Sequence, residues 1–118
     1  LAAIVGVGSV TLVGNELNNT LVTRAGNDTL SGGGGDDALV GGTGVDYFVF
    51  DDNWGSDIVY DFEDGTDLID LQSVTSLTDV SQLNITQNGS HTDIAFGGDT
   101  IKLLNTTATD ITVADFML

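Results

Sequence analysis

Aspartates recur at a fixed interval around the glycine-rich stretch LSGGGGDDALVGGTGVDYFVF, residues 30–50. Asp28, Asp37 and Asp46 are nine residues apart, and each ends a segment that contains glycine, four in residues 32–37 and three in residues 41–46. Glycine leaves backbone carbonyl oxygens accessible, and a hard cation such as calcium takes about six to eight carboxylate and carbonyl oxygens as ligands. The residue types and their spacing therefore predict a repeated cation-binding loop.

The aspartates belong to a nine-residue repeat. Its blocks begin at Val5, Gly14, Thr23, Gly32 and Gly41 and read VGVGSVTLV, GNELNNTLV, TRAGNDTLS, GGGGDDALV and GGTGVDYFV. The eighth position is always a large apolar residue, whereas the sixth is acidic only from the third block onward. The core pattern Gly-x-Asp-x-apolar returns at residues 55–59 and 65–69 after small insertions, which gives seven repeat units in all.

Each block predicts a six-residue loop and a three-residue strand, because no window places apolar residues at helical spacing. Stacked units form a parallel solenoid, in which loops eighteen residues apart lie on the same edge. We therefore expect an all-β fold, a parallel β-roll (a right-handed solenoid of nonapeptide repeats) with a C-terminal β-strand cap. We expect the roll over residues 1–71 and the cap with its tail over residues 72–118, as one compact module.

The repeat resembles the GGxGxDxUx calcium-binding nonapeptide of RTX (repeats-in-toxin) proteins, most strongly over residues 23–49 and more loosely over residues 5–71. The resemblance implies that calcium ions lie between stacked loops. The earlier loop would give carbonyls from its first and third positions, the later loop from its second and fourth, and each loop one aspartate. One site would use Thr23, Ala25 and Asp28 with Gly42, Gly44 and Asp46, and the opposite edge would use Gly32, Gly34 and Asp37 with Gly55 and Asp57. Further sites would pair Asp46 with Asp67, and Asn19 with Asp37, the last weaker or empty because Asn19 is neutral; the remaining candidate ligands are Gly33, Gly35, Gly41, Thr43 and Gly65.

The composition agrees with a cation-binding protein. The 118 residues include 18 acidic and 2 basic ones, for a net charge of −16, which would repel nucleic acid and anionic membranes. There is no cysteine, so disulfides and thiolate zinc sites are excluded. No apolar run approaches the ~20 residues of a membrane span. The chain begins at Leu1 without a visible secretion signal, and we expect it to be a fragment of a longer protein.

The C-terminal half resembles the closing segments of two families. GSDIVYDFEDGTDLIDLQ is similar to the end of the roll in serralysin-type protease C-terminal domains and in mannuronan epimerase repeat modules. Turn signals at residues 88–89 and 97–98 predict three further strands that cap the roll. The final Asp115-Phe116-Met117-Leu118 resembles the end of type I secretion substrates, and it is equally compatible with a last strand.

Other candidate groups favour structural roles. His91 is the only histidine and lies beside a predicted turn, and no GxSxG elbow accompanies Ser90. The glycine run has no P-loop lysine after it. Exposed turn acids are the preferred interpretation of Asp51, Asp52 and Asp64, and partial burial over the roll that of Trp54.

These observations predict a non-catalytic, calcium-binding RTX module from the C-terminus of a secreted bacterial protein, which folds on binding Ca2+ after type I secretion. The expected partners are calcium ions, the type I secretion exporter and an N-terminal catalytic or adhesive domain, in an extracellular location. The alternative is a carbohydrate-binding repeat module, as in a mannuronan epimerase, with a polysaccharide such as alginate as partner. Self-assembly through the solenoid edges is a third class, and catalysis by these residues is the least supported.

Overall fold

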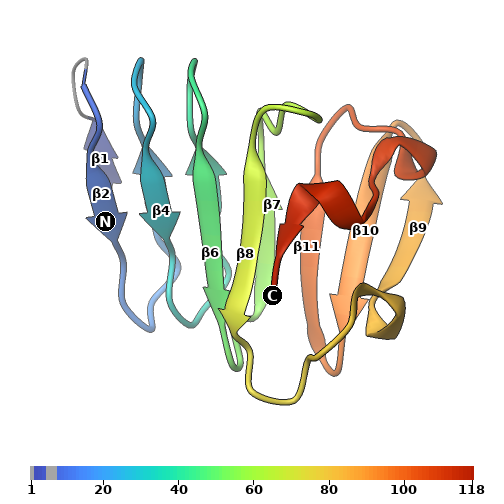
Figure 1. Cartoon of the computed structure of the whole chain (residues 1–118). Helices are drawn as coiled ribbons and strands as arrows, with labels where there is room; N and C mark the ends of the chain where they lie inside the picture. Colours follow the sequence, from blue (N-terminus) through green and yellow to red (C-terminus); the bar gives the residue numbers. More distant parts are fainter. Residues whose placement is uncertain (1, 5–7) are drawn as a thin grey trace.

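The computed structural model describes residues 2–4 and 8–118, with side chains from residue 8 onward. Within these residues the chain forms strands in two sheets and three short 3-10 helices, and no α-helix. The two sheets face each other (Figure 1), and apolar side chains from both sheets form one buried core. None of the described helices is long and apolar enough to span a membrane.

Sheet A has seven strands and sheet B has five. The order in sheet A is β1 (Ala2–Ile4), β3 (Thr20–Val22), β5 (Ala38–Val40), β7 (Ser56–Val59), β11 (Asp99–Leu103), β10 (His91–Phe96) and β9 (Asn84–Asn88). The order in sheet B is β12 (Phe116–Met117), β8 (Leu68–Ser73), β6 (Tyr47–Asp51), β4 (Thr29–Ser31) and β2 (Thr11–Val13). The 3-10 helices are η1 (Val80–Gln82), η2 (Ala108–Asp110) and η3 (Val113–Asp115).

The nine-residue period sets the register of the roll. The chain crosses to the other sheet at every loop, so parallel neighbours are two repeats apart and loops stack in two columns, one on each edge (Figure 1). In sheet B, Leu30 pairs with Phe48 and Phe48 with Ile69; all three side chains are fully buried. In sheet A, Leu21 pairs with Leu39 and Leu39 with Val59, which gives a second buried row. The predicted all-β parallel solenoid is confirmed.

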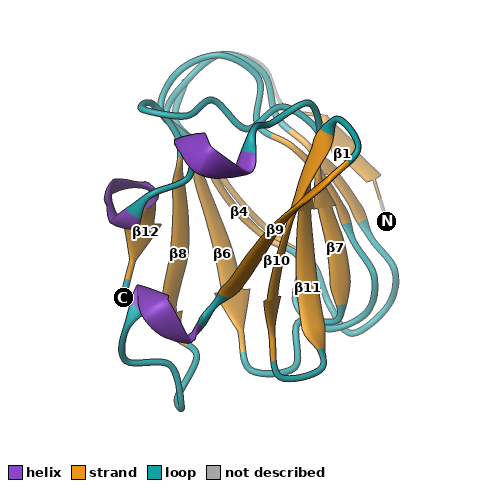
Figure 2. Ribbon diagram, turned by 90° about the vertical axis from the view of Figure 1, so that its right-hand side faces the viewer, coloured by secondary structure: helices purple, strands orange, loops and turns teal. Residues whose placement is uncertain are grey.

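The C-terminal segment continues both sheets. Strand β11 lies parallel to β7, and β10 and β9 follow in antiparallel hairpins. The predicted glycine turns form, with φ of 62° at Gly89 and 60° at Gly97. The last residues form β12, parallel to β8, so the tail adds a strand to sheet B. Figure 2, viewed from this end, shows β9, β10 and the 3-10 helices in front of the roll strands.

Trp54 is buried more completely than the sequence predicts. Its side chain is only 1% exposed, packs edge-on against Phe50, and donates from Nε1 to the Thr100 carbonyl at 2.9 Å. The expectation of partial burial over the roll is therefore wrong, because the inserted loop folds inward against β11. This side chain joins the last loops of the roll to the segment that covers them.

Candidate metal centre

Buried carboxylates line each edge of the roll. Asp28, Asp46 and Asp67 lie on one edge and Asp37 and Asp57 on the other, and none is more than 3% exposed. The sixth position of each loop places them there, two residues before the inward strand residue. A buried carboxylate is costly unless hydrogen bonds or a cation compensate its charge. The structure shows how far hydrogen bonds alone do so.

One oxygen of each acid is used to join successive loops. Asp28 Oδ1 accepts from the Val10 N–H at 3.0 Å, and Asp46 Oδ1 accepts from the Asp28 N–H at 3.0 Å. On the opposite edge, Asp37 Oδ1 accepts from the Asn19 N–H at 2.7 Å, and Asp57 Oδ1 accepts from the Asp37 N–H at 2.9 Å. We call these bonds the sixth-position ladder. Each acid therefore holds the loop that precedes it in the stack.

The second oxygen of these acids is left without a partner. Oδ2 of Asp28, Asp37, Asp46 and Asp57 is buried and accepts no hydrogen bond from the protein. An unpaired buried carboxylate oxygen costs several kcal/mol, on the order of the stability of a small domain. Four such atoms, two on each edge, are the donor chemistry that a hard cation requires. The residues present therefore fit a calcium ion between stacked loops.

Without cations these carboxyl groups resist ionisation. Burial raises the pKa of Asp57 to about 8, and the negative charges of Asp37, Asp36 and Asp99 act in the same direction. Burial, together with the charges of Asp67, Asp28 and Asp61, raises the pKa of Asp46 to about 7. The pKa values of Asp37 and Asp67 are also raised, again chiefly by burial. The raised pKa values reflect a fold in which the charged acids lack compensation.

Glycines let successive loops approach closely. Gly42 has a φ of 77° and Gly44 a φ of 99°, and a Cβ at either would collide with a backbone carbonyl of the preceding loop, that of Arg24 or Gly26. A Cβ at Gly41 would lie 2.5 Å from Asp46 Oδ2. The glycines at the first, second and fourth positions therefore make room for the carboxylate and the carbonyls.

Two of the predicted sites are built alike. The first brings Asp28 and its loop, with Thr23 and Ala25, against Asp46 and its loop, with Gly41, Gly42, Thr43 and Gly44. Thr23 fits the place of a glycine because its hydroxyl donates to the Gly41 carbonyl at 2.8 Å. The second brings Asp37 and the loop of Gly32, Gly33, Gly34 and Gly35 against Gly55 and Asp57.

The other two predicted sites differ. Both oxygens of Asp67 are used, since Oδ1 accepts from the Asp46 N–H at 3.0 Å and Oδ2 from the Glu63 N–H at 2.9 Å. Gly65 is exposed, and a Cβ there would meet nothing within 4 Å, so this glycine does not face the preceding loop. Asn19 presents a buried Nδ2 donor without a partner, which is unsuited to a cation. Asp67 and Asn19 are therefore the least prepared of the predicted ligands.

Sequence reasoning missed Asn53 and Asp61. Asn53 has a φ of 60° and takes the second position of its loop, where the regular repeats have glycine; a Cβ at Gly34 would lie 3.8 Å from its carbonyl oxygen. Asparagine is the residue that most readily replaces glycine at positive φ, which is the available signal. Asp61 accepts from the N–H groups of Gly41 and Gly42 at 2.9 and 2.7 Å, and no periodicity indicates this.

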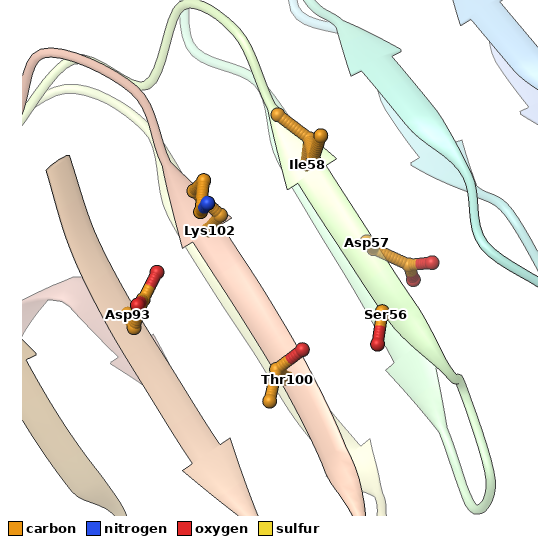
Figure 3. A pocket seen from close by; sticks show the side chains of 6 residues that line it. All are labelled: Ser56, Asp57, Ile58, Asp93, Thr100 and Lys102. Carbon is orange, nitrogen blue, oxygen red and sulfur yellow. The ribbon is translucent and has the colours of Figure 1, made fainter. Parts of the chain in front are cut away.

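In the chain from residue 8 onward, no three His, Cys, Asp or Glu side chains converge to hold a metal. His91 accepts from the Asn105 N–H through Nδ1 at 3.1 Å, a structural role. Separately, a pocket of about 310 Å³ lies between Ser56, Ile58, Asp93, Thr100 and Lys102, while the Asp57 carboxylate points away from it (Figure 3).

Comparison with known proteins agrees with this geometry. Residues 13–48 match the family model of the RTX calcium-binding nonapeptide repeat (4 copies). The extracellular lipase LipA from Serratia marcescens has a similar structure, with a TM-score of 0.65 and 25% identity over 99% of this chain and 20% of the lipase. The chain thus spans about a fifth of the length of that enzyme.

A second solved structure supports the fold alone. The AlgE6R3 subunit of the Azotobacter vinelandii mannuronan C5-epimerase gives a TM-score of 0.60 and 22% identity over 95% of this chain and 79% of the subunit. No match was found among curated protein sequences. Residues 13–48 therefore match RTX calcium-binding nonapeptide repeats, and they form part of a parallel β-solenoid whose stacked loops carry buried, unpaired carboxylate oxygens.

Proposed function

We propose that the chain is a non-catalytic calcium-binding module of a secreted bacterial protein, and that its folding is coupled to calcium binding. The observation that carries this proposal is the set of buried Oδ2 atoms on Asp28, Asp46, Asp37 and Asp57, none of which has a hydrogen-bond partner. Because no protein group donates a hydrogen bond to these oxygens, a bound cation would compensate their buried negative charge. The module comprises the β-roll over residues 1–71 and the cap with its tail over residues 72–118.

Calcium ions would be held by Asp28 and Asp46 on one edge and by Asp37 and Asp57 on the other, with loop carbonyls completing each site. The bound ion supplies positive charge that cancels paired carboxylates. The chain's own residues do the rest, because each Oδ1 already holds the preceding loop and the glycines permit close stacking. Metal binding then contributes directly to the free energy of folding.

The same electrostatics supports secretion of the chain in an unfolded form. Where calcium is scarce, a chain of net charge −16 would resist compaction and suit passage through a type I exporter. Outside the cell, sites of this kind work at calcium concentrations of about 10⁻⁴ to 10⁻³ M. The neighbouring lipase is described as extracellular, which supports this location. The attached N-terminal domain, catalytic or adhesive, would belong to the longer protein.

A calcium titration of the ion-free chain tests the proposal. Far-ultraviolet circular dichroism and Trp54 fluorescence should both change on adding calcium, and much less with magnesium, which keeps its water ligands. Asp28→Asn with Asp37→Asn should shift the midpoint to higher calcium, whereas Asp110→Asn, an exposed acid in η2, should not. A spectrum that is the same in excess chelator and in ample calcium would refute the proposal.

An acidic polysaccharide is the second-ranked partner. Lys102 lies in the outer pocket of sheet A, but Asp93 lies opposite it across β10 and β11 and offsets its charge (Figure 3). A polyanion would also meet the net charge of −16. Calorimetry of the calcium-loaded module against alginate oligomers distinguishes this candidate, since heat of binding would support it.

A further inference from the structure

The N–H groups of Gly41 and Gly42 are bonded differently from those of the regular repeats. In the regular part of the roll, the N–H of a first-position residue donates to the ninth-position carbonyl two repeats later, as Gly14 does to Ser31 at 2.7 Å. Gly41 instead donates to Asp61 Oδ1 at 2.9 Å, and Gly42 donates to Asp61 Oδ2 at 2.7 Å. Both oxygens of one side chain therefore hold the start of a single loop.

The backbone at this point is also held from the opposite side, by Thr23. The Thr23 N–H donates to the Val40 carbonyl at 2.9 Å, and its hydroxyl donates to the Gly41 carbonyl at 2.8 Å. The Val40 carbonyl shares a trans peptide with the Gly41 N–H, and the Gly41 carbonyl shares one with the Gly42 N–H, so the two groups of each peptide point in opposite directions. We call these two peptides the clamped peptides. They lie between Thr23 of the preceding loop on this edge and Asp61 of the following one.

The clamped peptides border the predicted site of Asp28 and Asp46. A Cβ at Gly41 would lie 2.5 Å from Asp46 Oδ2, the oxygen that has no hydrogen-bond partner. A Cβ at Gly42 would collide with the carbonyl of Arg24, which belongs to the loop of Asp28. The start of the later loop therefore touches both the unpaired carboxylate oxygen and the earlier loop of this site.

The two glycines do not fix this arrangement by themselves. Gly42 has a φ of 77°, and glycine has more backbone freedom than any other residue. Gly41 is buried, and a buried N–H that loses its acceptor is costly. The opposite edge is built differently: Asp52 takes the same first position of its loop, but its carboxylate accepts from the N–H and hydroxyl of Thr75 at 3.0 and 2.8 Å. Asp61 therefore gives one edge a support that Asp52 does not give the other.

We propose that Asp61 is a positioning residue for the calcium site of Asp28 and Asp46, acting through the clamped peptides and not as a ligand. The inference rests on the proposed calcium binding. Each oxygen of Asp61 already accepts a backbone N–H, whereas the unpaired oxygens belong to Asp28 and Asp46. Loss of Asp61 should lower calcium affinity at this edge and leave the site of Asp37 and Asp57 as it is.

A calcium titration followed by NMR reports the two edges separately. The Asp28 N–H donates to Asp46 and the Asp37 N–H donates to Asp57, so the two amide signals serve as reporters. In Asp61→Ala we expect the calcium midpoint of the Asp28 signal to rise about tenfold and that of the Asp37 signal to stay within about twofold, because loss of a group that supports a metal ligand costs about 10- to 100-fold in affinity. Asp61→Asn removes the same charge but keeps one acceptor oxygen, so it should raise the first midpoint much less.

The matched control is Asp52→Ala, which removes an acid from the same loop position on the other edge and should leave the midpoint of the Asp28 signal unchanged. An unchanged Asp28 midpoint in Asp61→Ala would overturn the inference. Equal midpoints in Asp61→Ala and Asp61→Asn would overturn it as well, because charge alone would then explain the loss. Equal shifts of both reporters would show that Asp61 supports the whole fold and would also overturn it.

Circular dichroism at saturating calcium verifies that each variant folds. If Asp61→Ala does not fold, Thr23→Val decides, because it removes only the hydroxyl bond on the other side of the clamped peptides. It should shift the midpoint of the Asp28 signal alone, and a shift of both signals or of neither would overturn the inference. Failure of the unaltered chain to bind calcium would instead overturn the proposed function itself.

Discussion

Acid should replace calcium as a stabiliser of the fold. The carboxyls of Asp57 and Asp46 have pKa values raised from 3.8 to about 8 and about 7 in the ion-free chain. A group with a raised folded-state pKa stabilises the fold fully below its unfolded pKa, and this stabilisation is lost as the pH rises through the folded-state value. The ion-free fold should therefore be more stable at pH 5 than at pH 9.

The size of this effect follows from the two shifts. At pH 5 the unfolded chain has already lost both protons. The folded chain keeps the Asp57 proton for about three further pH units and the Asp46 proton for about two. At about 1.4 kcal/mol per unit, these amount to about 7 kcal/mol. Solvent around the loops screens the interaction, and about half of this value, roughly 3 to 4 kcal/mol, is a realistic expectation. That is a large fraction of the stability of a domain this size, about 5 to 15 kcal/mol.

The assay measures the folded fraction of the ion-free chain across this pH range by circular dichroism and Trp54 fluorescence, with urea unfolding at each pH at which the ion-free chain folds. Calcium is removed beforehand by resin, because soluble chelators weaken in acid. Asp57→Asn, which is neutral at every pH, should flatten the dependence, and Asp110→Asn should not. An ion-free chain whose stability is constant or rises from pH 5 to pH 9 would refute the reasoning that the buried acids lack compensation.

Three further expectations follow from single residues. Asp46→Asn should weaken calcium binding more than Asp67→Asn in calorimetry, because Asp46 has an unpaired oxygen and Asp67 has none; equal losses would contradict this. In calcium, Gly42→Ala should lower the free energy of unfolding by more than about 2 kcal/mol and Gly89→Ala by about 1 kcal/mol, since both glycines have positive φ but only a Cβ at Gly42 would meet a backbone carbonyl; equal shifts of the two thermal midpoints would contradict this. Trp54→Phe should cost about 1 to 3 kcal/mol in the same measurement, because the Thr100 carbonyl loses its donor, and an unchanged midpoint would show that this bond adds nothing.

The period of nine was sufficient to predict the regular part of the roll. Leu30 and Phe48 lie side by side in sheet B because one large apolar residue recurs at the eighth position, and that also fixes which loops stack. The same spacing places Asp28 beside Asp46, eighteen residues later, whereas Asp57 follows Asp37 by twenty residues because two residues are inserted between their loops. Periodic residues were predictable since each repeat has the same surroundings.

The residues inserted before residues 55–59 and 65–69 break the period, so contacts in these loops could not be predicted from it. Asn53 occupies a glycine position that alignment by repeats did not assign, and Asp61 reaches back to Gly41 and Gly42 from an irregular turn. Asp67 fits the repeat pattern, yet its second oxygen is taken by the Glu63 N–H within its own turn. Hydrogen bonds of this kind depend on where the backbone turns after an insertion, and the repeat pattern does not predict the position of that turn.

In the sixth-position ladder every N–H donor lies nearer the N-terminus than its acceptor, so shortening the chain from its two ends should have different effects. The Val10 N–H depends on Asp28, the Asp28 N–H on Asp46, and the Asp46 N–H on Asp67, always on a residue nearer the C-terminus. Asp67 itself is fixed by Glu63, four residues away, and so needs no later loop. Deletions from the N-terminal end therefore leave each remaining N–H donor of the ladder with its aspartate. Deletions from the C-terminal end remove the aspartates, so the N–H donors of the preceding loops lose their acceptors one after another.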